Sequence, residues 1–200
     1  MIDSVDALRE LYAQPKGRSL TKQLERLDVH CARFVALSPF VVVATGRPGA
    51  HMDCSPRGGE PGFVKVVDGR TLLLPDSPGN NRLDSMTNIL ETGRIGLLFL
   101  IPGVDETLRV NGGARLADEP EKLAHFARAA RAPKLAIEVA VEEAYLHCAK
   151  ALMRSKLWAP ESLRERSVLP TMGQMLNDQT GKAAPAESQE AMVARYLPDL

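Results

Sequence analysis

The strongest local signal in the sequence is Asp68-Gly69, which stands between the apolar segments 63–67 and 71–74. An Asp-Gly pair flanked by two strand-like segments predicts a tight β-hairpin. Other strand-like segments are separated by Pro and Gly and contain many β-branched residues. They are 40–45, 52–58, 94–101, 107–116 and 135–147. About six or seven short strands with hairpin connections favour an antiparallel barrel or sandwich over a parallel α/β sheet.

The remaining patterned segments predict helices at the periphery of this sheet. In residues 19–37, apolar residues recur at intervals of three and four, which is typical of one helix face. That stripe is interpreted as core or subunit packing, and it consists of Leu20, Leu24, Leu27, Cys31, Phe34 and Val35. The other expected helices are 4–12, a helix that ends near Glu91, 119–131, 148–158, 170–177 and 187–196, with a loop over 178–186.

These segments suggest three parts of the chain. Residues 1–37 are expected to form N-terminal helices that pack on the barrel. Residues 38–158 are expected to form the barrel, and residues 159–200 a C-terminal helical extension. The predicted fold class is mainly β with peripheral helices.

Composition excludes several kinds of partner. The 25 basic residues balance the 25 acidic ones, which argues against a general electrostatic attraction to nucleic acid or to a membrane. The N-terminus has neither a basic region nor an apolar run, and the apolar segments are too short to span a bilayer. Three widely spaced cysteines without a CxxC pair are most simply explained by a reducing cytoplasm, so we expect a cytoplasmic protein.

The segment Leu72–Met86 contains the first candidate site. It reads as a strand, a turn rich in Pro, Gly and Asn, and the start of a helix. Free backbone N–H groups at a helix N-terminus, together with Arg82, form a plausible cradle for a phosphate. Asn81 and Arg82 at the helix start, with Ser55 and Arg57 on a neighbouring strand, would clamp the phosphate from two sides. The alternative is an ordinary tight turn with solvated arginines, and the residues alone favour neither.

The second candidate is a row of Lys150, Arg154 and Trp158, which follow one another at intervals of four residues. On one helix they would share a face and could cover an anionic or aromatic ligand. The alternative, favoured by the residues alone, is a solvated basic face with a tryptophan packed at the helix end.

Histidine and cysteine patterns do not indicate other chemistry. The four histidines lack the spacing of a metal site, so no metal is expected. There is no GxSxG motif, and His147 and Cys148 would point to opposite faces of a strand. Cys148 is therefore expected to be a buried structural cysteine.

Six sequence blocks occur in the order that one flavoprotein family shows. They are Asp53-Cys-Ser-Pro-Arg-Gly58; Pro61-Gly-Phe-Val64; Leu74-Pro-Asp76 with Pro78-Gly-Asn-Asn-Arg82; Gly96-Leu-Leu-Phe-Leu-Ile-Pro-Gly103; Glu106-Thr-Leu-Arg-Val-Asn-Gly112; and His147-Cys-Ala-Lys-Ala-Leu-Met-Arg154 with Leu157-Trp158. Over residues 24–158 the chain resembles a subgroup of the pyridoxamine 5′-phosphate oxidase-like, FMN-binding split-barrel proteins. The tail Ala194–Leu200 lacks the histidine and tryptophan of the true oxidases, so synthesis of pyridoxal phosphate is not implied.

The resemblance implies an antiparallel, Greek-key split β-barrel that forms a homodimer with FMN at the subunit interface. It implies that the strand from Asp53 to Arg57 runs along the flavin, and that Asn81 and Arg82 bind the phosphate. Pro75 and Asp76 would lie beside the isoalloxazine ring, and Thr107 would make a polar contact with the flavin. The full set of expected cofactor-binding residues is Asp53, Cys54, Ser55, Arg57, Pro75, Asp76, Asn81, Arg82, Thr107, Lys150, Arg154 and Trp158.

The function implied is an FMN-dependent oxidoreductase that acts on an unidentified small molecule and receives electrons from NAD(P)H or passes them to oxygen. FMN performs the hydride or electron transfer, so no acid–base pair in the protein is required and no catalytic residue is named. The alternatives are a flavin-binding storage or sensor module without turnover, and a split barrel that binds haem or deazaflavin F420 instead.

Overall fold

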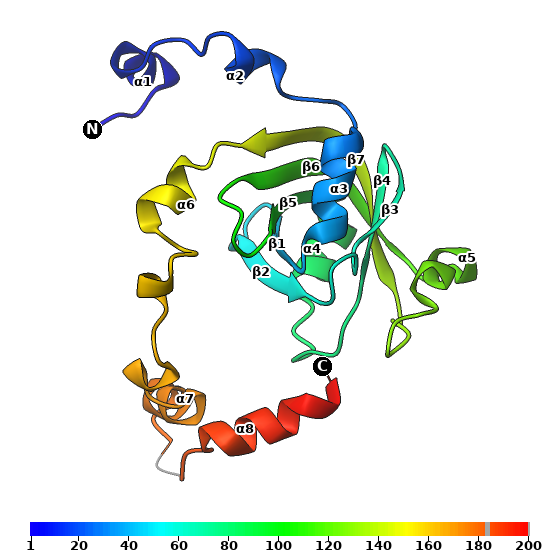
Figure 1. Cartoon of the computed structure of the whole chain (residues 1–200), viewed down its shortest axis with the longest axis vertical. Helices are drawn as coiled ribbons and strands as arrows, with labels where there is room; N and C mark the ends of the chain where they lie inside the picture. Colours follow the sequence, from blue (N-terminus) through cyan, green and yellow to red (C-terminus); the bar gives the residue numbers. More distant parts are fainter. Residues whose placement is uncertain (183–184, 200) are drawn as a thin grey trace.

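Seven strands form one antiparallel sheet that curls into a split barrel (Figure 1). The computed structural model describes residues 1–182 and 185–199, apart from the side chains of residues 19 and 20. The strand order is β2-β1-β5-β6-β7-β4-β3. The predicted fold class, mainly β with peripheral helices, is confirmed. The strands are β1 (Phe40–Thr45), β2 (Asp53–Gly58), β3 (Lys65–Asp68), β4 (Thr71–Pro75), β5 (Arg94–Leu100), β6 (Thr107–Ala117) and β7 (Ala136–His147).

Alternation along the strands separates an inner, apolar face from an outer face. In β1 every second residue is buried, and its neighbours in β5 and β6 follow the same pattern. In β6, Leu108 and Val110 lie on the inner face, and Thr107, Arg109 and Asn111 lie on the outer face. Helices α3 (Val29–Leu37) and α4 (Asp84–Thr92) pack on the sheet and contribute to the core. The buried residues at its centre are Val35, Val41, Val43, Leu97, Phe99, Leu108 and Val110.

The predicted hairpin at Asp68-Gly69 is also confirmed. Strands β3 and β4 pair in antiparallel register on either side of the turn, and the Asp68 carboxylate accepts a hydrogen bond of 2.7 Å from the backbone N–H of Arg70. The Gly69 carbonyl accepts a bond of 2.7 Å from the N–H of Leu27. The turn therefore anchors the chain just before α3.

The prediction of one helix over 19–37 was wrong. The structure has α2 (Arg18–Thr21) and α3, with non-helical chain between them. Leu24 exchanges two backbone hydrogen bonds, of 2.9 and 2.8 Å, with Ala144 of β7, which removes those groups from a helix. Asp28 then caps α3 by accepting a bond of 2.8 Å from the N–H of Cys31. The predicted stripe still packs inward from Leu24 onward, whereas the side chain of Leu20 lies outside the described part.

Two other helices are shorter than predicted. Residues 119–131 contain only α5 (Pro120–Leu123) and the 3-10 turn η1 (Ala124–Phe126). Residues 148–158 contain only α6 (Lys150–Ser155), because Lys156 adopts a left-handed conformation that ends the helix. The helix predicted after the phosphate turn agrees with the structure. It is α4, which ends at Thr92 and has Gly93 as its C-cap.

The N-terminal segment lies outside the barrel, whereas the C-terminal segment leaves it after β7 and returns at its end (Figure 1), where Asp199 pairs with Arg131 at 2.9 Å. Helix α1 (Val5–Leu11) precedes the sheet, and α7 (Met172–Thr180) and α8 (Gln189–Tyr196) follow it; none of the three has a buried residue. The remaining 3-10 turns are η2 (Pro160–Ser162), η3 (Arg166–Val168) and η4 (Leu197–Asp199). Helix α7 extends into the loop predicted over 178–186, and residues 183–184 of that loop lie outside the described residues. The division into three parts stays a prediction.

Over residues 1–182 and 185–199, none of the helices combines the length and apolar character that crossing a bilayer would require.

Gly112 provides a test of the sheet. The register between β6 and β7 shifts between Asn111 and Gly112, and a Cβ on Gly112 would lie 2.0 Å from the carbonyl oxygen of Ala140. A Cβ on the adjacent Gly113 would make only ordinary contacts, the nearest at 3.7 Å. We therefore expect Gly112→Ala to lower the free energy of unfolding by about 2 kcal/mol or more, because backbone has to move. Gly113→Ala should change it by less than about 1 kcal/mol. Urea unfolding of both variants measures the difference, and equal losses would show that the close approach is not a constraint.

Candidate functional site

A polar cluster lies where β2 meets the start of α4. Alternation in β2 turns Asp53, Ser55 and Arg57 to one face, where each is half-buried. The Ser55 hydroxyl donates to Asp53 Oδ1 at 2.7 Å, and the Ser85 hydroxyl of α4 donates to Asp53 Oδ2 at 2.5 Å. Arg57 Nη2 donates to the same Ser85 hydroxyl at 3.1 Å. The Asp53 carboxylate thus connects β2 to α4 and helps to place the Arg57 guanidinium.

A buried polar pair supports this cluster from β1 and α4. Asn88 Nδ2 donates to Thr45 Oγ1 at 3.0 Å, and Thr45 Oγ1 lies 3.5 Å from Asp53 Oδ2. The side chains of Thr45, Ser85 and Asn88 are only 3 to 4% exposed. Buried polar groups are stable only when they are hydrogen-bonded, so this pair fixes how α4 sits on β1.

The turn before α4 brings a second arginine to the same end of the sheet. Asn81 and Leu83 have φ angles of 57° and 59°, in the left-handed region that costs energy for residues other than glycine. Arg82 Nε donates to Asp84 Oδ2 at 2.8 Å. This hydrogen bond and the charge of Asp84 raise the pKa of Arg82, and the charge of Asp53 adds to the effect. Arg82 therefore lies within electrostatic reach of the β2 cluster.

The N-terminus of α4 keeps donors available. Its N-cap, Leu83, makes no side-chain hydrogen bond to the helix. Backbone N–H groups at an uncapped helix start attract anions, and the helix dipole adds to the attraction. Pro75 ends β4, and Asp76 follows it at the beginning of the same connection, where its N–H donates to the Leu135 carbonyl at 2.9 Å.

Thr107 does not join this cluster within one chain. It begins β6 and pairs with His147 of β7, on the outer face of the sheet. Strands β1 and β5 lie between β6 and β2, a separation of about 14 Å at the usual strand spacing. Arg57 pairs with Val41, a residue of the inner face. The two predicted flavin contacts are therefore on opposite faces of the sheet.

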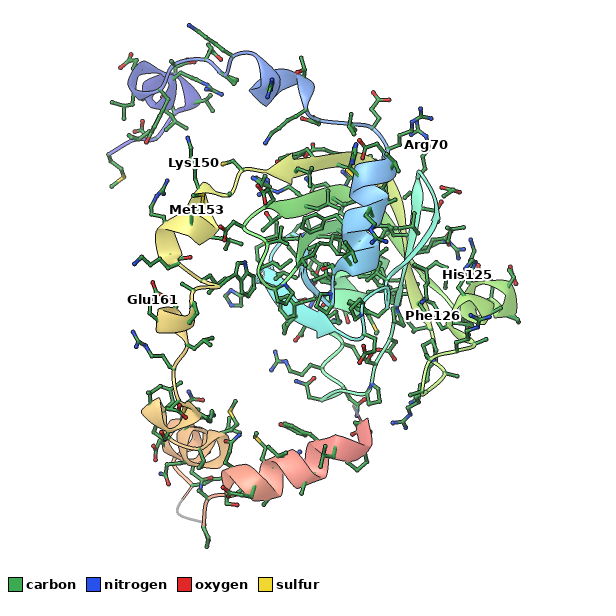
Figure 2. All side chains as sticks on the ribbon, viewed as in Figure 1. Arg70, His125, Phe126, Lys150, Met153 and Glu161 are labelled. Carbon is green, nitrogen blue, oxygen red and sulfur yellow. The ribbon has the colours of Figure 1, made fainter. Side chains whose placement is uncertain are left out.

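The predicted row of Lys150, Arg154 and Trp158 is not formed. Lys150 and Arg154 are exposed on α6, and Figure 2 shows that Lys150 lies away from the sheet. Trp158 comes after the left-handed residue that ends the helix, so it leaves the row. Its indole Nε1 donates to the Val104 carbonyl at 2.9 Å, which anchors the segment to the β5–β6 connection.

The cysteines differ from expectation. Cys54 lies on the opposite face of β2 from Ser55 and is exposed. Cys148 is exposed as well, because the chain leaves the sheet at His147; the prediction that it is buried was wrong. The buried cysteine is Cys31 of α3, where burial and a hydrogen bond with Asp28 raise the pKa of the thiol to about 11.

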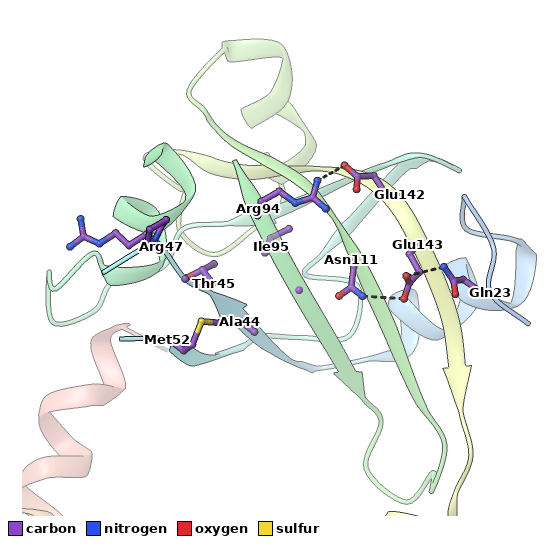
Figure 3. Close-up of a pocket in the computed structure, with 13 residues that line it drawn as sticks. Gln23, Ala44, Thr45, Arg47, Met52, Arg94, Ile95, Asn111, Glu142 and Glu143 are labelled. Carbon is purple, nitrogen blue, oxygen red and sulfur yellow. Dashed lines mark hydrogen bonds and ion pairs between the residues drawn. The ribbon is translucent and has the colours of Figure 1, made fainter. Parts of the chain in front are cut away.

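Sequence reasoning missed a groove at one end of the outer face (Figure 3). Its volume is about 840 Å³, and β1, β5, β6 and β7 contribute to its walls. Glu143 accepts hydrogen bonds from Gln23 at 2.9 Å and from Asn111 at 3.1 Å, and Arg94 pairs with Glu142 at 2.7 Å. These polar side chains in the groove thus form hydrogen bonds and ion pairs with one another. The alternating polar residues of β6 were the sequence signal that could have located it.

Comparison with known proteins agrees with the fold. A family model described as Pyridoxamine 5'-phosphate oxidase matches residues 27–148. The chain therefore belongs to the pyridoxamine 5'-phosphate oxidase family. No curated protein matches the chain.

Solved structures of this shape are distant in sequence. HupZ of Group A Streptococcus is 15% identical with a TM-score of 0.50, and the match covers 60% of this chain and 93% of that one. A second HupZ structure is 16% identical with the same TM-score and covers 60% and 98%. A structure described as a pyridoxamine 5'-phosphate oxidase homologue from Lactobacillus delbrueckii is 16% identical, covers 62% and 98%, and has a TM-score of 0.48. At these identities the likeness concerns the fold alone.

The exposure of the cysteines can be tested by alkylation. We expect iodoacetamide at about pH 8 to modify Cys54 and Cys148 in the folded protein and to leave Cys31 unmodified, since only a thiolate reacts and Cys31 stays a thiol at that pH. Mass spectrometry of the digested protein locates the label. Protein unfolded in urea should be labelled at all three positions. Rapid labelling of Cys31 in the folded protein would contradict the packing of α3.

Proposed function

We propose that this protein binds FMN, with the phosphate at the junction of β2 and α4, and that it is an FMN-dependent oxidoreductase acting on an unidentified small molecule. The observation that carries the proposal is that Arg57, bonded to Ser85 of α4, and Arg82, two residues before the helix begins, both belong to its uncapped N-terminal end. Membership of the pyridoxamine 5'-phosphate oxidase family supports the same ligand.

The chemistry of these residues fits a phosphate dianion. Two guanidinium groups and helix N–H groups are the donors that phosphates prefer. Asp53 carries the same charge sign as the ligand, but the hydroxyls of Ser55 and Ser85 already occupy its two oxygens. Its part is therefore to position Arg57 rather than to touch the phosphate. The Arg57 guanidinium makes no carboxylate ion pair in the described residues, so its charge is available to a ligand.

The ring would extend from the phosphate toward Pro75 and Asp76, and FMN, when bound, supplies hydride or electron transfer. The protein binds the phosphate, orients the ring and limits the access of water. Thr107, Lys150 and Arg154 lie apart from the phosphate cluster of their own chain. We assign them to the flavin of a partner subunit, which makes the functional unit a homodimer with FMN at the interface. Trp158, tied to Val104, would hold the segment that carries the two cations.

The proposal also includes a pyridine nucleotide as the electron donor and a cytoplasmic location. Both rest on the resemblance and on cysteine usage rather than on a residue of the site. Neither a nucleic acid nor a membrane is needed as a partner.

FMN binding is the test. We expect the purified protein to be yellow or to take up added FMN, and Arg57→Ala and Arg82→Ala each to weaken FMN binding by about tenfold to a hundredfold, the usual worth of a charge-assisted hydrogen bond. Arg128→Ala, which changes an exposed arginine of the α5–β7 connection, is the matched control and should bind as the parent protein does. Flavin fluorescence titration measures the dissociation constants. A colourless protein that takes up no FMN would refute the proposal.

Turnover is a separate measurement. Anaerobic mixing of the FMN-loaded protein with NADH or NADPH should bleach the flavin absorbance, and oxygen should restore it. Loaded protein that neither nucleotide reduces would indicate a flavin-binding module without turnover with these donors.

A further inference from the structure

We propose that Lys22, Arg109, Tyr145 and His147 form a second anion-binding site, for the carboxylate or phosphate group of a small molecule, on the outer face of β6 and β7. This site is separate from the Arg57 cluster and does not depend on the binding of FMN.

The geometry gathers two cations around one aromatic ring. Arg109 and Tyr145 are cross-strand partners, and Arg109 Nη1 donates to the Tyr145 hydroxyl at 2.9 Å. The Arg109 guanidinium carbon lies 5.6 Å from the centre of the Tyr145 ring, and Lys22 Nζ lies 4.9 Å from it. Lys22 is also held by the Leu146 carbonyl, at 3.0 Å. The two cations are exposed, and these contacts hold both of them beside the Tyr145 ring.

His147 extends the cluster toward Thr107. Its ring centre lies 4.9 Å from that of Tyr145. Its Nε2 atom is buried and has no hydrogen-bond partner within the described chain. Burial, followed by the charges of Arg109 and Lys22, lowers the pKa of His147. A buried polar nitrogen without a partner is rare in folded proteins and here is explained by a missing ligand atom.

The positive charge of the cluster is not cancelled by a partner. Among the described residues, neither Lys22 nor Arg109 forms an ion pair with a carboxylate. The carboxylate two residues from Tyr145 on the same face, Glu143, is bound by Gln23 and Asn111. Arg94 of β5 shows the contrast, because it lies on the same face and is paired with Glu142.

These features define the ligand. An oxyanion can accept hydrogen bonds from a guanidinium, an ammonium and, where the tautomer or protonation state allows, an imidazole N–H. Carboxylates and phosphates share this chemistry, whereas a neutral or cationic molecule would leave the cations unsatisfied. If FMN binds as proposed above, the pairing of Thr107 with His147 places the anion close to the predicted flavin contact.

The experiment uses the imidazole of His147 as a local reporter. The ring-proton NMR signal of His147 is identified as the one that is missing from His147→Gln. Inorganic phosphate and, separately, acetate are titrated at constant pH and ionic strength. We expect a saturable shift of this signal with at least one of the two anions, and the anion that binds more tightly identifies the preferred group.

Substitutions of the two cations test whether they bind the anion. Arg109→Met and Lys22→Met should each weaken binding by about tenfold, the loss of one charged hydrogen bond, while Arg94→Met should leave it unchanged. Arg128→Ala should also leave it unchanged, because that exposed arginine belongs to the α5–β7 connection. The proposal is overturned if neither anion gives a saturable shift, or if Arg109→Met and Arg94→Met bind equally.

Sedimentation of the same variants distinguishes a ligand from a protein contact. If Arg109→Met changes the oligomeric state and the parent protein shows no anion-dependent shift, the cluster serves to bind another chain, and the proposal of a small-molecule site is wrong.

Discussion

Strand β6 is the element on which the rest of the structure depends, because it hydrogen-bonds to β5 on one side and to β7 on the other. Gly112 permits this double pairing, since β7 approaches so closely there that no side chain would fit. The pairing passes from Asn111–Glu143 to Gly112–Val141, so Glu142 is an extra residue in β7. A one-residue change of register exchanges the two faces of a strand. The bulge is thus what places Glu143, Tyr145 and His147 on the outer face beside Asn111, Arg109 and Thr107, and it creates both the groove and the cationic cluster.

A second set of interactions on which the structure depends is the hydrogen-bond network that joins β2 to α4. An edge strand has neighbours on only one side and is usually the least constrained part of a sheet. Here Asp53 accepts hydrogen bonds from Ser55 on its own strand and from Ser85 on α4, and Thr45 lies beneath it. A carboxylate in a predicted phosphate site looks unfavourable from the sequence. In the structure it is the shared acceptor that holds the hydroxyl to which Arg57 donates.

Sequence reasoning succeeded where structure is determined locally. Apolar segments rich in β-branched residues and bounded by Pro and Gly located the strands, and Asp68-Gly69 located the hairpin. It failed where contacts between residues far apart in the sequence determine the local structure. Leu24 pairs with Ala144, more than a hundred residues away, and no helix-periodic stripe can reveal that. Lys156 ends α6 in a left-handed conformation without a glycine to announce it. Ser85 and Asn88 were also missed, because their burial comes from the packing of α4 against β1 and β2, which are distant in the sequence.

Under the proposed function, one chain would hold only part of the flavin site. Arg57 belongs to the inner face near the edge strand, and Thr107 to the outer face beside His147, with β1 and β5 between them. A rigid sheet cannot bring these residues to one ligand. A flavin held by Arg57 and Arg82 can meet a Thr107 only if that threonine comes from another copy of the chain. The proposed contact of Thr107 with FMN therefore requires the proposed homodimer, whereas the cluster around Tyr145 is complete within one chain and can be tested without either.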